Sequence, residues 1–302
     1  LGEPLRDAGW ALANQGDIDQ QSIAGAVSTG THGTGPTLQN FSALVTRLRI
    51  ATATADIIEC DADSDAELFE AARCGLGLFG VITDVWLQLV PAYRLHERVW
   101  RESPDECLSR VDERVAATRH FEFFWLPQKD QCELKSLALT ESPPDEMAGV
   151  DYEYVDHSDR VFPSEREDRF EEMEFALPAD AGPECFVELR NWIRRHYPDL
   201  EWPIEYRTVA QDDVWLSPAQ GRATVTILVH QAAGLPFGEL FEDCQSIMRG
   251  FDGRPHWGKR HTMSAQSLAE HYPAWNQFSE VRKRCDPQGI FLNESLERLF
   301  GG

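Results

Sequence analysis

The sequence predicts an α+β fold made of two units that meet near residue 92. Residues 1–92 alternate short apolar strands with helices of small residues, whereas residues 93–302 contain longer strands broken by helices. Of the 302 residues, 42% are hydrophobic and 26% are charged, which allows each unit its own core. We therefore expect two domains, 1–92 and 93–302, in one globular protein.

The first unit is predicted from changes in hydrophobic period along the chain. Small side chains predict a helix at 22–30 that packs closely on a sheet, and residues 65–75 predict a helix that ends at a glycine. Strands are expected at 44–51, at 56–60 and at 81–90, the last one buried and closed by Pro91.

The second unit is predicted to form a broad antiparallel sheet with helices on one face. Its expected strands lie at 93–101, 120–127, 133–141 and 222–231, and its longest expected helix at 183–197. Residues 141–183 are rich in proline, aspartate and glutamate, which predicts a loop with short strands.

Charge and cysteine content exclude several classes of function. A formal net charge of −23 would repel phosphate backbones and anionic lipid headgroups, so we expect neither nucleic acid nor a membrane surface as partner. Seven widely spaced cysteines without a C-x-x-C pair predict reduced, mostly buried thiols and no metal site. No apolar run reaches the ~20 residues of a membrane helix, and a cytoplasmic protein is expected.

One short loop carries the first functional signal. The stretch STGTHGTG, residues 28–35, surrounds one histidine with three glycines and four hydroxyls. Glycines allow close approach of the backbone to a ligand, and hydroxyls can donate to phosphate or carbonyl oxygens, so the loop suits a nucleotide cofactor. A plain structural turn, with His32 as a packing residue, is the alternative on these residues alone.

Longer segments favour the cofactor. GDIDQQSIAGAVSTGTHGTG, residues 16–35, resembles the flavin-binding signature of sugar-lactone and alditol oxidases, which are flavoproteins of the vanillyl-alcohol-oxidase type. GLFGVIT at 77–83 is similar to the end of that family's flavin domain. GRPHWGK at 253–259 and DPQGIFLNESLERLFG at 286–301 resemble the C-terminal signature of the D-arabinono-1,4-lactone oxidase group, which also includes L-gulonolactone oxidases.

This resemblance implies FAD as the cofactor and an FAD-binding domain of the PCMH type. Residues 1–92 would then be the second half of the flavin domain, and 93–302 a substrate (cap) domain whose segment 251–302 returns to the flavin. The implied cofactor-binding residues are Ser22, Gly25, Ala26, Gly30, Thr31, His32, Gly33, Thr34, Gly35, Gly80, Val81, Ile82, His256 and Lys259.

The family's upstream half, with a second glycine-rich loop and in many members a histidine that binds FAD covalently, has no counterpart in these 302 residues. The chain starts at Leu1, and its first residues are typical of the end of a helix, so we expect a further segment before it. On that basis this stretch alone is expected to hold FAD weakly or not at all.

Four residues are candidates for the chemistry. Lys259 would be the cation beside flavin N1 and C2=O, although composition alone would make it a surface lysine. Glu205 and Arg207 share one strand face at i and i+2, where they could form hydrogen bonds with hydroxyls of a substrate. The alternative is an exposed ion pair without function. His230, near the end of its strand, could face the substrate.

The function implied is oxidation of a CH–OH group of a sugar-1,4-lactone, by hydride transfer to flavin N5, with oxygen or another acceptor reoxidising the flavin. The partner is then a small-molecule lactone or polyol. An alditol oxidase is the first alternative, and a non-catalytic fragment that lacks the first flavin-binding half is the second.

Overall fold

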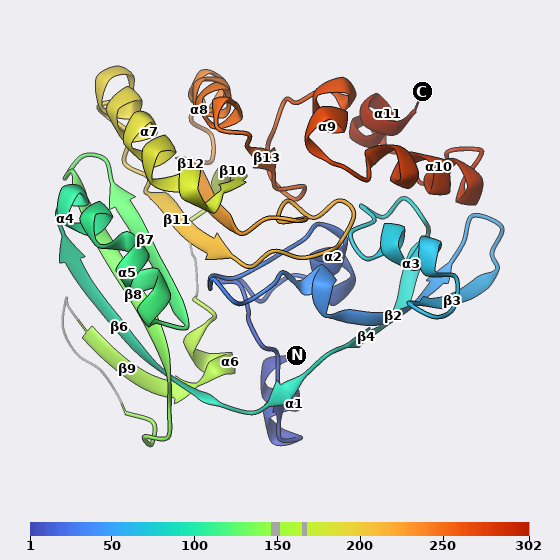
Figure 1. Ribbon diagram of the computed structural model, residues 1–302, viewed down its shortest axis with the longest axis horizontal. Helices are drawn as coiled ribbons and strands as arrows, with labels where there is room; N and C mark the ends of the chain where they lie inside the picture. Colours follow the sequence, from blue (N-terminus) through green and yellow to red (C-terminus); the bar gives the residue numbers. More distant parts are fainter. Residues whose placement is uncertain (146–151, 165–167, 302) are drawn as a thin grey trace.

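An eight-stranded antiparallel sheet is the largest element of the computed structural model, which describes residues 1–145, 152–164 and 168–301 (Figure 1). Its strands, in spatial order, are β13 (Arg254–Pro255), β10 (Phe170–Pro178), β12 (Thr224–Ala232), β11 (Ile204–Val209), β7 (His120–Leu126), β8 (Gln131–Thr140), β6 (Arg94–Glu102) and β9 (Tyr152–His157). The α+β fold class and the broad antiparallel sheet predicted from the sequence are confirmed.

Two smaller sheets come from the first part of the chain. One has three strands in the order β3 (Ile57–Asp61), β2 (Val45–Ala51) and β4 (Val81–Leu87), and the other pairs β1 (Trp10–Ala11) with β5 (Val90–Pro91). The chain passes from the smaller sheets to the large one between β5 and β6. A domain boundary at residues 92 and 93 stays a prediction.

Helices and short 3-10 turns connect these strands. They are α1 (Gly2–Asp7), α2 (Ile23–Ser28), η1 (Phe41–Leu44), α3 (Ala66–Ala72), α4 (Pro104–Ser109), α5 (Val111–Ala117), α6 (Ser158–Val161), η2 (Ala179–Ala181), α7 (Gly182–His196), α8 (Gly238–Gly250), α9 (Ala265–His271), α10 (Trp275–Cys285) and α11 (Glu294–Phe300).

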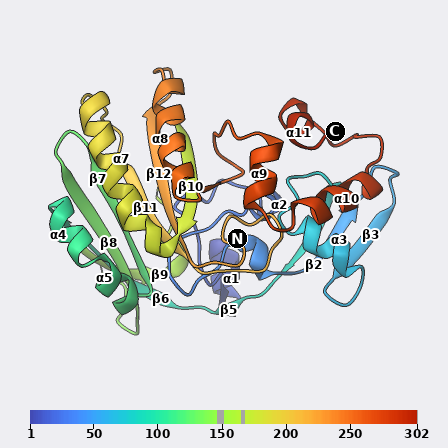
Figure 2. The same cartoon turned by 45° about the horizontal axis from the view of Figure 1, so that its top comes forward.

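Helices α4, α5, α7 and α8 lie together on one face of the large sheet (Figure 2), as the sequence predicted. Aromatic side chains fill the space between them and the strands: Phe123 stacks on Tyr206 at 4.7 Å between ring centroids, and Phe186 of α7 meets Phe123 edge-on at 5.0 Å. Burial of such apolar surface contributes about 25 cal/mol per Å², so this face carries much of the stability of the sheet.

The opposite face of the same sheet is polar. Strand register places Glu205 of β11 across from Leu228 of β12, which in turn lies across from Glu174 of β10. His230 lies across from Glu172 in the neighbouring row. Since residues in register share a face, the sheet brings several carboxylates and a histidine together on the side away from its helices.

Two predictions from the sequence are wrong. The stretch 141–183, taken as loop with short strands, contains the nine-residue strand β10, which pairs with β12 along its whole length. Within its sequence FEEMEFALP, residues 172–175 alternate glutamate with an apolar residue, which is the period of a strand, but the acidic composition of the stretch obscured this signal. Residues 146–151 and 165–167 of the predicted loop lie outside the described residues.

The strand predicted as buried at 81–90 is the other error. It ends at Leu87 as β4, with β5 following as a separate strand, and one of its faces is open: Val81 is 61% exposed and Trp86 38%. The indole of Trp86 instead lies within 6 Å of the guanidinium groups of Arg47 and Arg49, an arrangement that partly shields an exposed aromatic ring.

The C-terminal helices pack back on the first part of the chain. Phe278 of α10 meets Phe79 edge-on at 5.2 Å, and Arg284 forms an ion pair of 2.5 Å with Glu67 of α3. Segment 251–302 therefore contacts both the first part of the chain and the large sheet, where β13 pairs with β10. Its contact with the flavin stays a prediction.

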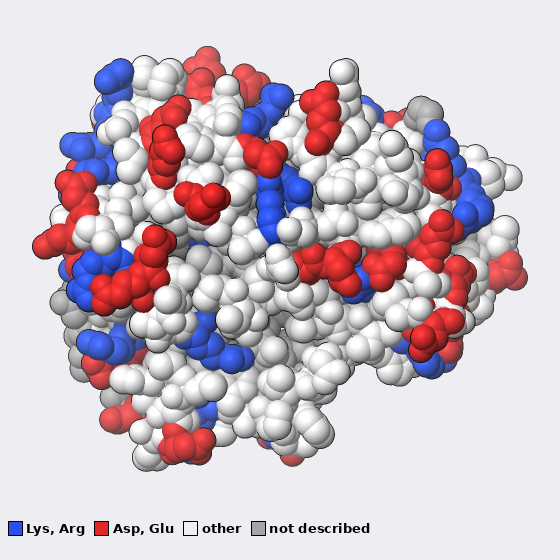
Figure 3. Space-filling view, viewed as in Figure 1, with Lys and Arg blue, Asp and Glu red and all other residues white. Residues whose placement is uncertain are grey.

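The surface view shows acidic and basic side chains interspersed, without a broad basic patch on that face (Figure 3). Six of the seven cysteines are buried free thiols, and Cys285 is half-buried. Within the described part of the chain, no helix is both long and apolar enough to cross a bilayer.

Candidate functional site

A pocket of about 230 Å³ lies on the polar face of the large sheet and brings seven of the predicted site residues together. These seven are Thr31, His32, Glu205, Arg207, His230, His256 and Lys259. The remaining lining residues are Gly16, Asp17, Ile18, Gln21, Phe170, Glu172, Glu174 and Leu228. Residues from both ends of the sequence and from its middle therefore converge on one site.

The other predicted cofactor residues do not line this pocket. They are Ser22, Gly25, Ala26, Gly30, Gly33, Thr34, Gly35, Gly80, Val81 and Ile82. Ser22 caps α2 by accepting a hydrogen bond from the backbone N–H of Gly25 at 3.1 Å. Any cofactor contact of these ten residues stays a prediction.

The glycines of the loop 28–35 are explained by packing of the chain on itself. A Cβ atom on Gly33 would lie 2.1 Å from the carbonyl oxygen of Gln15, and one on Gly35 would lie 2.8 Å from that of Arg119. Gly35 also has a φ of +145°, which L side chains rarely adopt. These two glycines permit close contacts between backbone segments of the protein itself. Close approach to a ligand is therefore not needed to explain them.

Thr34 and Gly35 attach the same loop to the large sheet. The hydroxyl of Thr34 donates to the carbonyl of Phe121 at 2.8 Å and accepts from the backbone N–H of Thr208 at 3.2 Å. The N–H of Gly35 donates to the carbonyl of Thr208 at 2.8 Å. These bonds to β7 and β11 fix the loop so that the preceding residues, Thr31 and His32, face the pocket.

Gly80 has a similar structural role in the three-stranded sheet. Its φ is +134°, and a Cβ atom there would lie 2.3 Å from the carbonyl oxygen of Ala51 on β2. The next two residues, Val81 and Ile82, begin β4. The structure therefore places this segment in a sheet and apart from the pocket lining.

Lys259 is a buried cation, and the surface-lysine alternative is wrong. Its ammonium lies 2.6 Å from Glu174 and 3.0 Å from Glu172, both on β10. Burial disfavours the charged ammonium, but these two carboxylates outweigh it and raise the pKa of Lys259. Lysine at this position is therefore charged at neutral pH.

Glu205 and Arg207 form a buried pair, so the alternative of an exposed ion pair is also wrong. The Arg207 guanidinium contacts Glu205, lies 2.8 Å from Asp17 and donates from Nε to Glu122 at 3.1 Å. Lys135 continues the network, 3.4 Å from Glu122. One guanidinium thus faces three carboxylates, which leaves negative charge in surplus around it.

This surplus shows in the titration of Glu205. Burial, together with the charges of Asp17 and Glu122, raises the pKa of Glu205 to about 8 against the opposing effect of Arg207. The carboxyl group is therefore largely protonated near neutral pH, where it can donate a hydrogen bond as well as accept one.

A stability measurement tests this protonation. An unfolded glutamate titrates near ~4.3, so Glu205 contributes stability that is complete below that pH and is lost as the pH rises through about 8. Glutamine does not titrate. We expect Glu205→Gln to gain about 1 kcal/mol or more in unfolding free energy relative to the unmodified protein between about pH 5 and about pH 9. Urea unfolding of both proteins at both pH values measures this gain. The same difference in unfolding free energy between variant and unmodified protein at both pH values would contradict a protonated Glu205.

His230 and His256 both line the pocket and make hydrogen bonds of different kinds. Nδ1 of His230 bonds the carbonyl of Pro203 at 2.9 Å. Nδ1 of His256 accepts from the backbone N–H of Gly258 at 3.0 Å, so its proton lies on Nε2. Burial lowers the pKa of His256 to about 3, which keeps this ring neutral.

Sequence reasoning missed the acidic residues of the site. Glu172 and Glu174 lie on the strand that was taken for loop, and the period-two pattern of FEEMEFALP could have found them. Asp17 belongs to the stretch 16–35, but nothing local marks it as a partner of Arg207. Glu122 lies on a predicted strand, but the sequence does not show that this strand pairs with β11.

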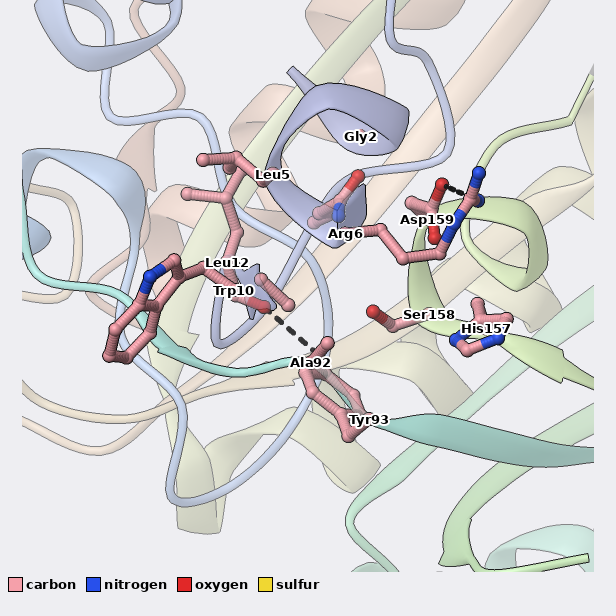
Figure 4. Close-up of a pocket in the computed structure, with 12 residues that line it drawn as sticks. Gly2, Leu5, Arg6, Trp10, Leu12, Ala92, Tyr93, His157, Ser158 and Asp159 are labelled. Carbon is pink, nitrogen blue, oxygen red and sulfur yellow. Dashed lines mark hydrogen bonds and ion pairs between the residues drawn. The ribbon is translucent and has the colours of Figure 1, made fainter. Parts of the chain in front are cut away.

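A further hollow lies beside α1 and α6 (Figure 4). It holds only about 10 Å³, and the ion pair between Arg6 and Asp159, at 2.5 Å, closes one side of it. That volume is about the size of one water molecule, so the hollow does not accommodate a substrate.

A metal ion is a further possibility in the pocket, because ligand atoms of His32, Glu174 and His256 lie within 4.8 Å of one another. The second carboxylate oxygen of Glu174 already contacts the ammonium of Lys259. A cation at this distance repels a metal ion, so the arrangement suits a hydrogen-bonded charge network better.

Comparison with known proteins gives the relationship. The family model for D-arabinono-1,4-lactone oxidase matches residues 85–150 and 145–299. L-gulono-1,4-lactone dehydrogenase of Mycobacterium tuberculosis is 37% identical over 100% of this chain and 79% of its own length, and the alditol oxidase of a Streptomyces species is 30% identical over 97% and 77%.

A solved structure shows the same fold. Cholesterol oxidase from Brevibacterium sterolicum superposes with a TM-score of 0.83 at 14% identity, covering 99% of this chain and 79% of that one. At such low identity the likeness concerns the fold alone. The two sequence comparisons decide the relationship: the chain belongs to the D-arabinono-1,4-lactone oxidase family of FAD-dependent oxidoreductases.

Proposed function

We propose that the protein oxidises a CH–OH group of a sugar-1,4-lactone, with FAD as the electron acceptor. The observation that carries this proposal is the convergence of Lys259, Glu205 and Arg207 on one pocket beside Thr31 and His32. The relative named L-gulono-1,4-lactone dehydrogenase, which matches the whole chain, supports the choice of a lactone.

The donors in the pocket fit a flavin ring. The ring presents carbonyl oxygens and ring nitrogens, which accept hydrogen bonds, and Lys259, Thr31 and the Nε2–H of His256 are donors that line the pocket. No hydrogen bond from that Nε2–H is present among the described residues. These side chains, with His32, would hold the ring. When bound, FAD supplies the two-electron acceptor, which takes a hydride at N5.

Lys259 would hold a positive charge against the side of the ring that becomes negative on reduction. The two glutamates that contact its ammonium keep it charged and fix its position. A preorganised charge in a buried site costs no reorganisation when the reaction occurs, which is why one such group can have a large effect on rate.

Glu205 and Arg207 would orient the substrate. Arg207 uses Nε and Nη2 for its three carboxylates, and Nη1 has no partner among the described residues, so it can donate to a substrate hydroxyl. Protonated Glu205 can donate to one oxygen of the substrate and accept from another. His230, in the row beside Glu205, would add a further polar contact.

Alditol oxidation is the second candidate, favoured by the Streptomyces relative at 30% identity. Steady-state kinetics of the FAD-loaded protein with L-gulono-1,4-lactone, D-arabinono-1,4-lactone, xylitol and sorbitol separates the two. We expect kcat/KM for one of the lactones to exceed that for either alditol by at least ~10-fold, or ~1.4 kcal/mol in transition-state binding. A reversed preference would establish the alditol alternative instead.

A further inference from the structure

Each ring nitrogen of His32 lies within 2.8 Å of an oxygen atom. Nδ1 lies 2.8 Å from the carbonyl oxygen of Gly33, and a carbonyl oxygen only accepts hydrogen bonds. Nε2 lies 2.7 Å from Oε1 of Glu174, a carboxylate oxygen. Both neighbours are acceptors, and a ring with a proton on each nitrogen, an imidazolium, would complement both of them.

Two nearby imidazoles have different surroundings. Nδ1 of His256 accepts from a backbone N–H, and the two rings of His32 and His256 lie 5.6 Å apart. Nδ1 of His120 donates to the carbonyl of Thr34 at 2.7 Å, while its buried Nε2 has no partner among the described residues. Burial lowers the pKa of both His120 and His256 to about 3. Of these three histidines, His32 is the one that faces a carboxylate at hydrogen-bond distance.

The two oxygens of Glu174 face two different nitrogens. Oε1 lies against Nε2 of His32, and Oε2 lies 2.6 Å from Nζ of Lys259. Its side chain is 1% exposed, so water does not replace either partner. Burial alone would favour the neutral acid, but Lys259 and His32 outweigh it and hold the pKa of Glu174 well below its usual range.

We propose that Glu174 is a positioning residue that holds His32 as an imidazolium on one oxygen and Lys259 as an ammonium on the other. The pocket wall thereby presents two fixed positive charges around one carboxylate. This inference rests on the proposed function, because a wall of this kind is suited to the negative charge that reduced flavin acquires.

The remaining charges near this group come from two strands of the large sheet, β10 and β11. Glu172 of β10 contacts Lys259 from its other side, and Arg207 of β11 is close enough to influence both Glu174 and His256. Glu172 is 30% exposed and does not contact His32 in the described structure, so Glu174 is the counter-ion of the imidazolium.

Nitrogen NMR of the histidine-labelled protein tests the charge of His32 directly. At neutral pH we expect both ring nitrogens of His32 to carry protons, while His120 and His256 each carry one, on Nδ1 and on Nε2 respectively. His32→Asn assigns the signal. An unprotonated Nε2 on His32 in the unmodified protein would overturn the proposal. The result comes from the unmodified protein, and the variant serves only to assign the signal.

Paired variants on β10 test the positioning. Glu174→Gln should leave His32 with a single proton and slow flavin reduction in the FAD-loaded protein by about tenfold, the effect of losing a charge-assisted hydrogen bond. Glu171→Gln, which changes a half-buried residue of the same strand that pairs with the exposed Arg260, should change neither. A normal reduction rate in Glu174→Gln would overturn the positioning role. Absence of any reduction by lactones in the unmodified protein would instead refute the proposed function and leave the NMR result standing.

Discussion

Replacement of Lys259 by methionine is expected to slow reduction of the bound flavin by ~10²- to 10³-fold, the scale of removing one preorganised charge stabiliser. The variant removes the ammonium that lies within 3.0 Å of both Glu172 and Glu174. Glu174 keeps His32 as its second partner, so we expect a lower melting temperature but a folded protein. Rapid mixing of the FAD-loaded variant with lactone, without oxygen, measures the rate.

Arg260 offers a matched control for this variant. It follows Lys259 in sequence, is also cationic and is 60% exposed in an ion pair with Glu171. Because exposed pairs contribute at most ~1 kcal/mol, Arg260→Met should reduce flavin at the normal rate. Reduction at the normal rate in Lys259→Met would remove this lysine from the mechanism.

Replacement of Arg207 by methionine is expected to affect both folding and turnover. The variant leaves Asp17, Glu122 and Glu205 without their shared cation, and breaking a buried ion pair costs ~3 to 5 kcal/mol. We also expect kcat/KM to fall at least ~10-fold, or ~1.4 kcal/mol, because Arg207 lines the pocket. Thermal melts and steady-state kinetics measure the two effects separately.

Glu205→Leu should lower kcat/KM by a similar factor, because it removes both the donor and the acceptor that the protonated carboxyl offers to the substrate. Glu205→Gln, which keeps a donor and an acceptor, should change kcat/KM and stability much less near neutral pH. The double variant of Glu205→Leu and Arg207→Met should lose less than the product of the two single losses, because the residues orient one substrate together. Glu133→Gln, which removes an ion pair with Arg101 between neighbouring strands of the same sheet, is the control. Normal turnover in both Glu205→Leu and Arg207→Met would place the substrate site elsewhere.

Local patterns predicted the parts of the fold and site that depend on neighbours in sequence. Glu205 and Arg207 share a face because a strand has a period of two, and that is independent of which strand lies beside it. The predicted helix at 183–197 lies within one residue of α7 at each end. The antiparallel sheet followed from the length and spacing of its strands.

The remaining features depend on contacts between distant residues. Asp17 meets Arg207 across 190 positions, and Glu174 meets Lys259 across a sheet edge, so neither partner can be found from local period. Gly33 was interpreted through a ligand, whereas the nearest atom to its Cβ position belongs to Gln15. In each case the register between segments decides the neighbour, and a single sequence does not specify register.

Flavin reduction without oxygen tests the central proposal most directly. Once binding of FAD to the protein has been verified, the loaded protein is mixed with L-gulono-1,4-lactone or D-arabinono-1,4-lactone, and absorbance is followed near the oxidised flavin band, at roughly 450 nm. We predict that at least one lactone bleaches this band in the unmodified protein and in Arg260→Met, and far more slowly in Lys259→Met. A flavin that stays oxidised in the unmodified protein with both lactones would contradict the proposed function.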